Sequence, residues 1–152
     1  MRCGSKTLQY IAKRVFNTSL SDEESDRLCS LGPDGVSPEG LVSGFREIGL
    51  HHCQVVRNTD LATLQTIINA GGVVAICYVD GSIHAGHWIC VHHAIGQLGD
   101  SVFIWDSDTG YREVPDSWLL PHWFDYAVNE GEWILYRHTA VVGYANGVKP
   151  IV

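Results

Sequence analysis

The sequence predicts an α+β fold in which N-terminal helices pack on a C-terminal antiparallel β-sheet. Before Gly71-Gly72, apolar residues recur every three to four positions, as on one face of a helix. From Val73 onward they run continuously or alternate, as in strands. The 152 residues contain no repeat and no linker-like tract, so we expect a single domain over residues 1–152 whose tail after about residue 142 is irregular.

The helices expected in the first half carry clear start and stop signals. Ser21 with Glu24 three residues later forms a capping box. Ser37 precedes a proline at the first helical position, and Thr59-Asp60 caps the next helix. Gly49 is a typical stop after the third helix. Helices are expected at residues 5–16, 21–31, 37–48 and 60–70.

The strands expected in the second half are separated by turns rich in glycine and aspartate. Val73 to Val79 is a continuous apolar run, which is typical of a buried strand. One helical turn is expected after Asp116-Ser117 and ends before Pro121. Strands are expected at residues 51–56, 73–79, 87–95, 100–105, 111–114 and 132–136, with a loop at 80–86 and turns at 96–99 and 106–110.

Composition excludes several functions. The net charge is −7, from 17 acidic and 10 basic residues, whereas a general nucleic-acid binder needs a basic surface. No apolar run reaches the roughly 18 residues of a membrane helix, and no apolar signal-peptide segment is visible near the start. We therefore expect a cytoplasmic protein with no nucleic-acid partner and no membrane insertion; composition leaves the oligomeric state open.

The cysteines are odd in number and show no Cys-x-x-Cys spacing, so at least one is free or pairs between chains. In a reducing compartment we expect all of them to be free thiols. They are Cys3, Cys29, Cys53, Cys77 and Cys90.

Cys3 and His87 are the first candidates for chemistry. Cys3 lies directly before the first expected helix, where the positive end of the helix dipole favours a thiolate, and Gly4 leaves no bulk beside the sulfur. His87 opens a strand after a glycine-containing loop, so its imidazole would face a cleft; histidine is the usual base for a thiol. Taken singly, a mobile terminal cysteine and a surface histidine also fit these positions.

Asp106 ends the strand that follows His87. If Ile95 pairs with Asp100, the same register brings His87 and Asp106 to one face of the sheet, whereas a one-residue slip separates them. On the same face Asp106 would accept a hydrogen bond from the imidazole and orient it, as the third member of a triad does. The alternative is that residues 106–110 are simply a turn, in which aspartate is common.

A structural zinc site is a further alternative. Cys90 and His92 fall on one face of their strand, and residues 51–53 supply more ligand types, but the spacing is unlike the paired ligands of zinc sites. We therefore expect no metal and no other cofactor. Most of the late aromatic residues, among them Trp133, are expected in the core, whereas Trp88 is a candidate for a substrate cleft.

The order of these motifs along the chain resembles the papain-like superfamily and, within it, the C39 peptidase family of bacteriocin-processing, double-glycine leader peptidases. The resemblance covers roughly residues 3–133. Its most specific parts are Gly86-His87 and Asp106-x-x-x-Gly110 at their mutual spacing. The matching segments are Cys3-Gly4 with the helix 8–15, then 37–41, 71–76, 86–91 and 102–110.

The resemblance implies a papain-like fold and a cysteine peptidase. By that resemblance Cys3 would be the nucleophile, His87 the general base and then acid, and Asp106 the group that orients His87. Gly86 and Trp88 would contact a peptide or protein substrate, such as a leader peptide that ends in Gly-Gly. The resemblance implies no cofactor.

A departure from the family pattern keeps alternatives open. The family usually carries a glutamine shortly before the cysteine, whose amide helps to hold the oxyanion, whereas Met1 and Arg2 precede Cys3 here. Gln9 and Gln54 do not match that position. A catalytically degenerate, peptide-binding module is therefore one alternative. An amidase or transferase with the same triad on the same fold is another.

Overall fold

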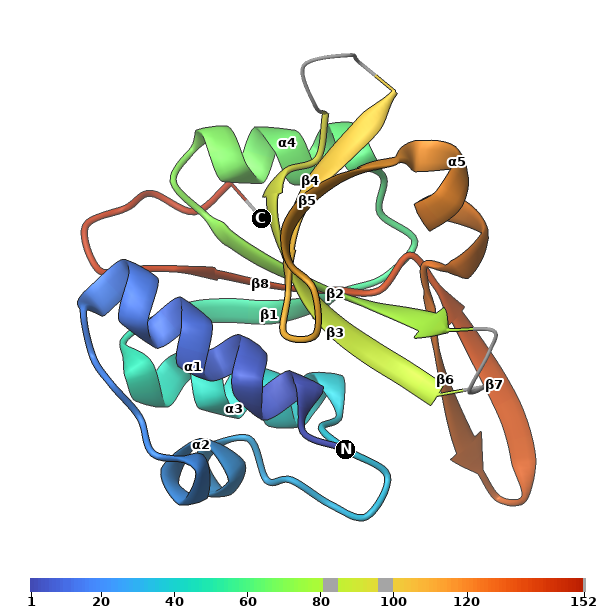
Figure 1. Ribbon diagram of the computed structural model, residues 1–152, viewed down its shortest axis with the longest axis horizontal. Helices are drawn as coiled ribbons and strands as arrows, with labels where there is room; N and C mark the ends of the chain where they lie inside the picture. The colour runs from blue at the N-terminus through green and yellow to red at the C-terminus, as the bar shows by residue number, and fades with distance from the viewer. Residues whose placement is uncertain (81–84, 96–99, 152) are drawn as a thin grey trace.

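The computed structural model, drawn in Figure 1, describes residues 1–80, 85–95 and 100–151. The turn expected at 96–99 and residues 81–84 of the expected loop lie outside the described residues. The strands are β1 (His52–Val56), β2 (Val73–Asp80), β3 (Ala85–His93), β4 (Ser101–Asp106), β5 (Gly110–Pro115), β6 (Phe124–Asn129), β7 (Glu132–Arg137) and β8 (Ala140–Tyr144). A six-stranded antiparallel sheet has the order β1-β8-β2-β3-β4-β5, and β6 and β7 pair as a separate hairpin.

The main helices begin where the sequence signals them, except the first. Ser21 and Glu24 form the capping box, and the side chains of Ser37 and Asp60 accept backbone N–H groups as N-caps. The first helix begins at Cys3, one half-turn earlier than expected. No helix in the described residues is both long and apolar enough to cross a membrane. The helices are α1 (Cys3–Phe16), α2 (Asp22–Leu28), α3 (Pro38–Ile48), α4 (Leu61–Asn69) and α5 (Asp116–Leu119), followed by the 3₁₀ turn η1 (Leu120–His122).

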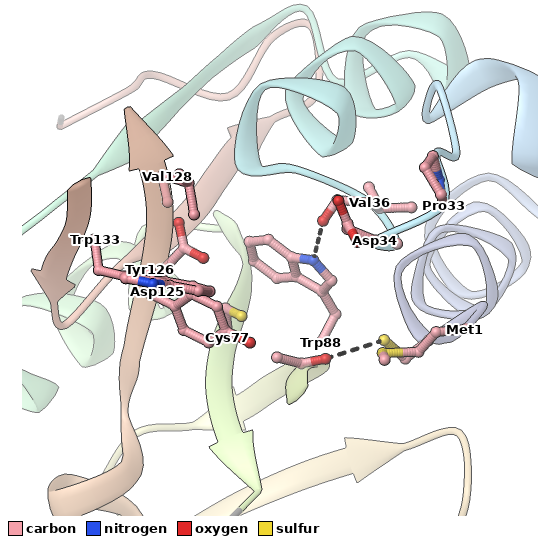
Figure 2. Close-up of a pocket in the computed structure, with 14 residues that line it drawn as sticks. Met1, Pro33, Asp34, Val36, Cys77, Trp88, Asp125, Tyr126, Val128 and Trp133 are labelled. Atoms are coloured by element: carbon pink, nitrogen blue, oxygen red, sulfur yellow. Dashed lines mark hydrogen bonds between the residues drawn. The ribbon is translucent and has the colours of Figure 1, made fainter. Parts of the chain in front are cut away.

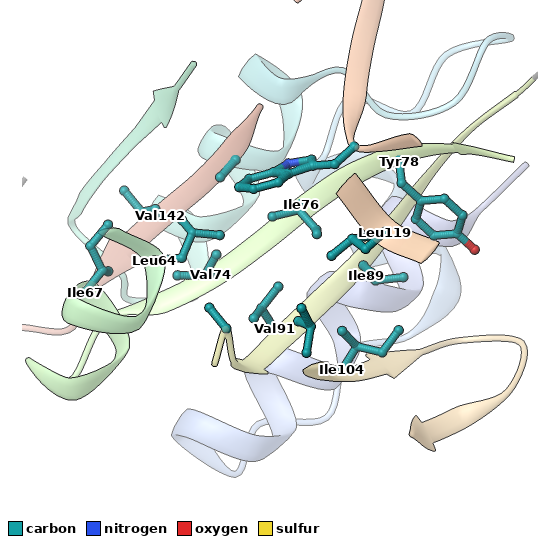
Figure 3. Close-up of a cluster of buried hydrophobic side chains, with 14 of the residues drawn as sticks. Leu64, Ile67, Val74, Ile76, Tyr78, Ile89, Val91, Ile104, Leu119 and Val142 are labelled. Atoms are coloured by element: carbon teal, nitrogen blue, oxygen red, sulfur yellow. The ribbon is translucent and has the colours of Figure 1, made fainter. Parts of the chain in front are cut away.

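The α+β class is confirmed, but the helices cover both faces of the large sheet. Helices α1 to α3 cover one face, where Leu8 belongs to the same apolar cluster as Ala75 of β2. Helices α4 and α5 cover the other face, where Leu64 and Leu119 pack with Ile76 (Figure 3). Successive residues of β2 alternate between the two clusters, so both faces of this strand are apolar and both need cover.

Strand β8 is a buried strand that the sequence analysis misses. It lies between β1 and β2, and all of its residues are buried, so the expected irregular tail begins after Tyr144. Gly143 interrupts the apolar pattern that would have revealed the strand. The glycine is required by packing, because a Cβ at this position would lie 2.9 Å from Phe45 Cδ2.

The pairing of β3 with β4 sets the register on which the candidate site depends. Cys90 pairs with Trp105, as the expected register requires. Nearer the turn, a β-bulge between Val91 and His93 shifts the pairing. If the shifted pairing continued along both strands without a bulge, His87 of β3 and Asp106 of β4 would lie on opposite faces of the sheet. The bulge therefore brings them to the same face.

Candidate active site

Cys3 is the first residue of α1 and is only 7% exposed. The residue before it, Arg2, is fixed to α2: its Nη1 lies 2.8 Å from Asp22 Oδ2 and its Nη2 lies 3.0 Å from Asp26 Oδ1. These contacts hold the start of α1 against the domain. The thiol is therefore packed at the positive end of a helix dipole, which favours the thiolate.

Gly4 has a packing role that the sequence does not reveal. Its missing side chain makes room for α1 to approach its neighbours, since a Cβ would lie 2.5 Å from Val36 Cβ and 3.1 Å from Trp88 Cδ1. This close approach brings the Cys3 thiol to the start of β3, where its Sγ lies 3.9 Å from the carbonyl oxygen of Gly86.

Replacing Gly4 with alanine should displace the start of α1. The Cβ of Val36 is tied directly to the backbone and cannot swing away, so we expect the free energy of unfolding to fall by about 1–3 kcal/mol. Denaturant unfolding measures this change. Gly32→Ala is the matched control, because the nearest atom to its new Cβ is 3.8 Å away. Equal losses in the two variants would contradict the packing role of Gly4.

His87 and Asp106 lie together on one face of the sheet. His87 Nε2 is 2.9 Å from Asp106 Oδ1, and both side chains are buried. The same Oδ1 accepts the backbone N–H of Asp108 at 2.8 Å, so the turn after β4 fixes the carboxylate. Asp106 can therefore hold the imidazole in one orientation and leave Nδ1 to another partner.

Cys3 and His87 meet at the start of β3. Cys3 belongs to the cluster on the α1–α3 face, whereas the His87 ring lies 5.3 Å from the ring of Tyr78 on the other face. In the described residues β4 pairs with β3 from Cys90 onward, so the earlier part of β3 extends past the end of β4. At this free edge the thiol and the imidazole are close enough for each to shift the pKa of the other.

Each member of this pair favours the charged form of the other. Burial acts to raise the pKa of the Cys3 thiol, but the hydrogen bond and positive charge of His87 outweigh it, and the pKa is lowered. Burial acts to lower the pKa of His87, but hydrogen bonds with Cys3 and Asp106 raise it to about 9. Both shifts favour a thiolate–imidazolium pair, and the thiolate is the nucleophilic form of cysteine.

The other thiols are not activated in this way. All five cysteines are free. Burial raises the pKa of Cys29 and of Cys90 to about 12, and burial also raises the pKa values of Cys53 and Cys77. Cys3 is therefore the thiol that we expect to react at neutral pH.

The pair implies a distinctive pH dependence for alkylation of Cys3 by iodoacetamide. An ordinary thiol with a pKa of about 8.5 is mostly protonated at pH 6 to 7, whereas the pKa of Cys3 is lowered, so we expect Cys3 to react there faster than cysteine in an unfolded peptide. The rate should change again as the pH rises through about 9, where His87 loses its proton. Mass spectrometry of the Cys3 peptide measures the rate. His87→Ala is the control, and a single ordinary step in the unmodified chain would contradict the pairing.

A pocket of about 540 Å³ opens beside Cys3 (Figure 2). The two predicted substrate contacts, Gly86 and Trp88, both line it, and the Trp88 ring is fixed by a 2.8 Å hydrogen bond from its Nε1 to the carbonyl oxygen of Val36. Figure 2 shows Trp133 of β7, with Tyr126 and Val128 of β6, on the side of the pocket that faces Trp88. The lining residues are Met1, Cys3, Pro33, Asp34, Gly35, Val36, Cys77, Gly86, Trp88, Asp125, Tyr126, Ala127, Val128 and Trp133.

The sequence analysis predicts β7 as a strand but misses β6 and the pocket wall that the two strands form together. Trp133, expected in the core, is 71% exposed, whereas Trp123 does lie in the core. A signal for the hairpin exists, because Tyr126, Val128 and Trp133 fall on one face of two alternating segments joined by a glycine turn. The alternation predicts an apolar face but does not show that this face borders a pocket.

One group of metal-type side chains stands out in the described residues, with ligand atoms within 4.8 Å of one another. Its members are His87, Asp106 and Asp108. The imidazole and the first carboxylate are already hydrogen-bonded to each other, which suits a triad. The alternative zinc pair, Cys90 and His92, has no third ligand within this limit among the described residues, and His92 Nε2 lies 2.7 Å from the Tyr10 hydroxyl.

Comparison with known proteins places the fold. No family model matches the chain. Among solved structures, the peptidase domain of Streptococcus ComA, a bifunctional ABC transporter involved in a quorum sensing pathway, matches with a TM-score of 0.65 and 14% identity over 93% of this chain and 90% of that one. A double glycine motif protease from an AMS/PCAT transporter, in complex with the leader peptide, matches with a TM-score of 0.62 and 13% identity over 95% and 85%. The chain therefore has the papain-like, C39-type fold of these peptidase domains.

Proposed function

We propose that the chain is a cysteine peptidase that cleaves a peptide bond through an acyl-enzyme. The observation that carries this proposal is the linked set of Cys3, His87 and Asp106, of which Cys3 lines the pocket. The fold supports it, because both structural neighbours are peptidases.

The proposed reaction has two halves. The Cys3 thiolate attacks the carbonyl carbon of the scissile bond, the His87 imidazolium gives its proton to the leaving amine nitrogen, and a thioester remains on Cys3. In the second half, neutral His87 takes a proton from water as the water attacks the thioester. Release of the acid leaves the thiolate–imidazolium pair again. Asp106 keeps the ring oriented and stabilises its charged form throughout.

The oxyanion formed in each half needs hydrogen-bond donors near Cys3. The first N–H groups of a helix have no partner within the helix. The internal hydrogen bonds of α1 begin with the Lys6 N–H, which donates to the Arg2 carbonyl. We assign the oxyanion to the N–H groups that open α1, beginning with Cys3. A donor of this kind contributes on the order of 10²–10³ in rate.

Glycine is the residue that we propose on the acyl side of the scissile bond. Trp88 is buried, held by its bond to Val36, and lines the same pocket as Cys3, so a larger side chain there would compete with the indole for space. One structural neighbour is a double glycine motif protease in complex with the leader peptide. This supports a substrate of the same kind here, a peptide with Gly-Gly before the cleaved bond.

Matched peptides that differ only in Gly-Gly or Ala-Ala before the scissile bond test the proposal. We expect cleavage after Gly-Gly and a kcat/KM at least about tenfold lower after Ala-Ala, since one methyl group in a tight pocket changes the rate by about 10–200-fold. Mass spectrometry of a quenched reaction should find the acyl group on Cys3. Binding without cleavage would identify a peptide-binding module instead. Turnover of simple amides or transfer to amines in place of peptide cleavage would identify an amidase or transferase.

A further inference from the structure

We propose that Arg112 is a positioning residue of this site, which holds the Asp106 carboxylate in place and moderates the negative charge that Asp106 presents to His87. The inference rests on the proposed triad for its importance. Its geometry stands independently: a cation on β5 lies near one oxygen of a buried carboxylate, and the imidazole lies near the other oxygen.

The placement of Arg112 follows from the β4–β5 register. Arg112 pairs with Ile104, and residues two apart on a strand share a face, so Arg112 lies on the same face as Asp106 and diagonal to it. Its Nη2 is 3.7 Å from Asp106 Oδ2. The other oxygen, Oδ1, accepts the Asp108 N–H and faces His87 Nε2. The two oxygens of the carboxylate are thus divided between the imidazole side and the guanidinium side.

Trp118 of α5 keeps Arg112 in this position. The guanidinium carbon lies 5.1 Å from the centroid of the Trp118 ring. The Trp118 ring lies 5.4 Å from the ring of Tyr78, which in turn lies 5.3 Å from the ring of His87. The Arg112 Nε is buried and has no hydrogen-bond partner among the described residues, so its contacts with Asp106 and Trp118 set the orientation of the side chain.

The charge of Arg112 has a defined effect on the pair at Cys3. The ionisable groups around His87 are Cys3 of α1, Tyr78 of β2, Asp106 at the end of β4, Asp108 in the turn after it, and Arg112 of β5. Among these side chains, Arg112 is the fixed cation and acts against the imidazolium. Its removal should therefore make the imidazolium harder to deprotonate and the thiolate harder to form, so both steps of the alkylation profile should move to higher pH.

The test measures the pH dependence of Cys3 alkylation by iodoacetamide. For Arg112→Met we expect both steps to move up by about 0.5–1 pH unit, as for a unit charge at partly exposed short range. Arg112→Lys, which keeps the charge, should restore most of the original profile. Arg57→Met is the matched control, because Arg57 also stacks on an aromatic ring, that of Tyr136, and also pairs with a carboxylate, that of Glu39. It should leave the profile unchanged.

Trp118→Leu tests the same inference without removing the cation, in case Arg112→Met does not fold. Loss of the ring should loosen Arg112 and move the profile upward by a smaller amount. An unmoved profile in a folded Arg112→Met or Trp118→Leu variant, whatever happens to the melting temperature, would overturn the positioning role. Alkylation of Cys3 can be measured without any peptide cleavage. If the chain hydrolysed no peptide, the proposed function would be refuted, but the role of Arg112 could still be tested by alkylation.

Discussion

Cys3→Ala is expected to abolish peptide hydrolysis while leaving peptide binding intact. Alanine removes the proposed nucleophile, so kcat/KM should fall by at least about 10³–10⁴-fold, as when the nucleophile of a triad is lost. The substitution is small, and alanine is a good helix former, so α1 should still form. Cleavage of the Gly-Gly peptide and equilibrium binding of the same peptide measure the two properties separately.

Cys53→Ala is the control for Cys3→Ala. Cys53 is a half-buried free thiol of β1 that does not line the pocket, so its loss should leave hydrolysis unchanged. Hydrolysis at the original rate by Cys3→Ala would show that the reaction occurs elsewhere. If the unmodified chain and the variant bind the peptide equally and neither cleaves it, the domain is a binding module and the catalytic proposal fails.

Local signals account for the part of the fold that the sequence predicts well. Ser21, Ser37 and Asp60 each satisfy a backbone N–H at the start of their own helix, so the information lies within a few residues. The start of α1 lacks such a signal, because its N-cap residue Arg2 makes no side-chain capping hydrogen bond and the helix begins two residues before the expected position. The pairing of β3 with β4 is also local, because the two strands follow one another in the chain.

The features that the sequence does not reveal depend on distant partners. The strand character of β8 is hidden by Gly143, which is required by Phe45 of α3. The bulge in β3 is invisible in the apolar pattern, yet it sets the faces of the two site residues. The contact of Arg112 with Asp106 needs the β4–β5 register together with the placement of Trp118 on α5. These contacts join residues whose proximity no short motif encodes.

Asp106→Asn is expected to lower kcat/KM for peptide cleavage by about 10²–10⁴-fold, the range set by loss of the orienting carboxylate in a triad. Asparagine keeps the size of the side chain and an oxygen that can accept the Asp108 N–H, so the turn after β4 should remain. It carries no negative charge to favour the imidazolium. Because Asp106 raises the pKa of His87, which reaches about 9, its neutralisation should lower that pKa and move the high-pH limb of the rate profile to lower pH.

The direction of this shift separates an electrostatic role from loss of stability. Arg112→Met and Asp106→Asn remove neighbouring groups of opposite charge. The pKa of His87 should therefore rise in the first variant and fall in the second, and the high-pH limbs of the two pH profiles should move in opposite directions. A variant that is merely less stable has fewer folded molecules, so its rate is lower at every pH, but the pH at which the rate falls does not change. Asp100→Asn neutralises an exposed carboxylate before the other end of β4 and should leave the profile unchanged. A high-pH limb in Asp106→Asn that matches the unmodified chain would show that this carboxylate does not support the imidazolium, and the triad would then reduce to Cys3 and His87.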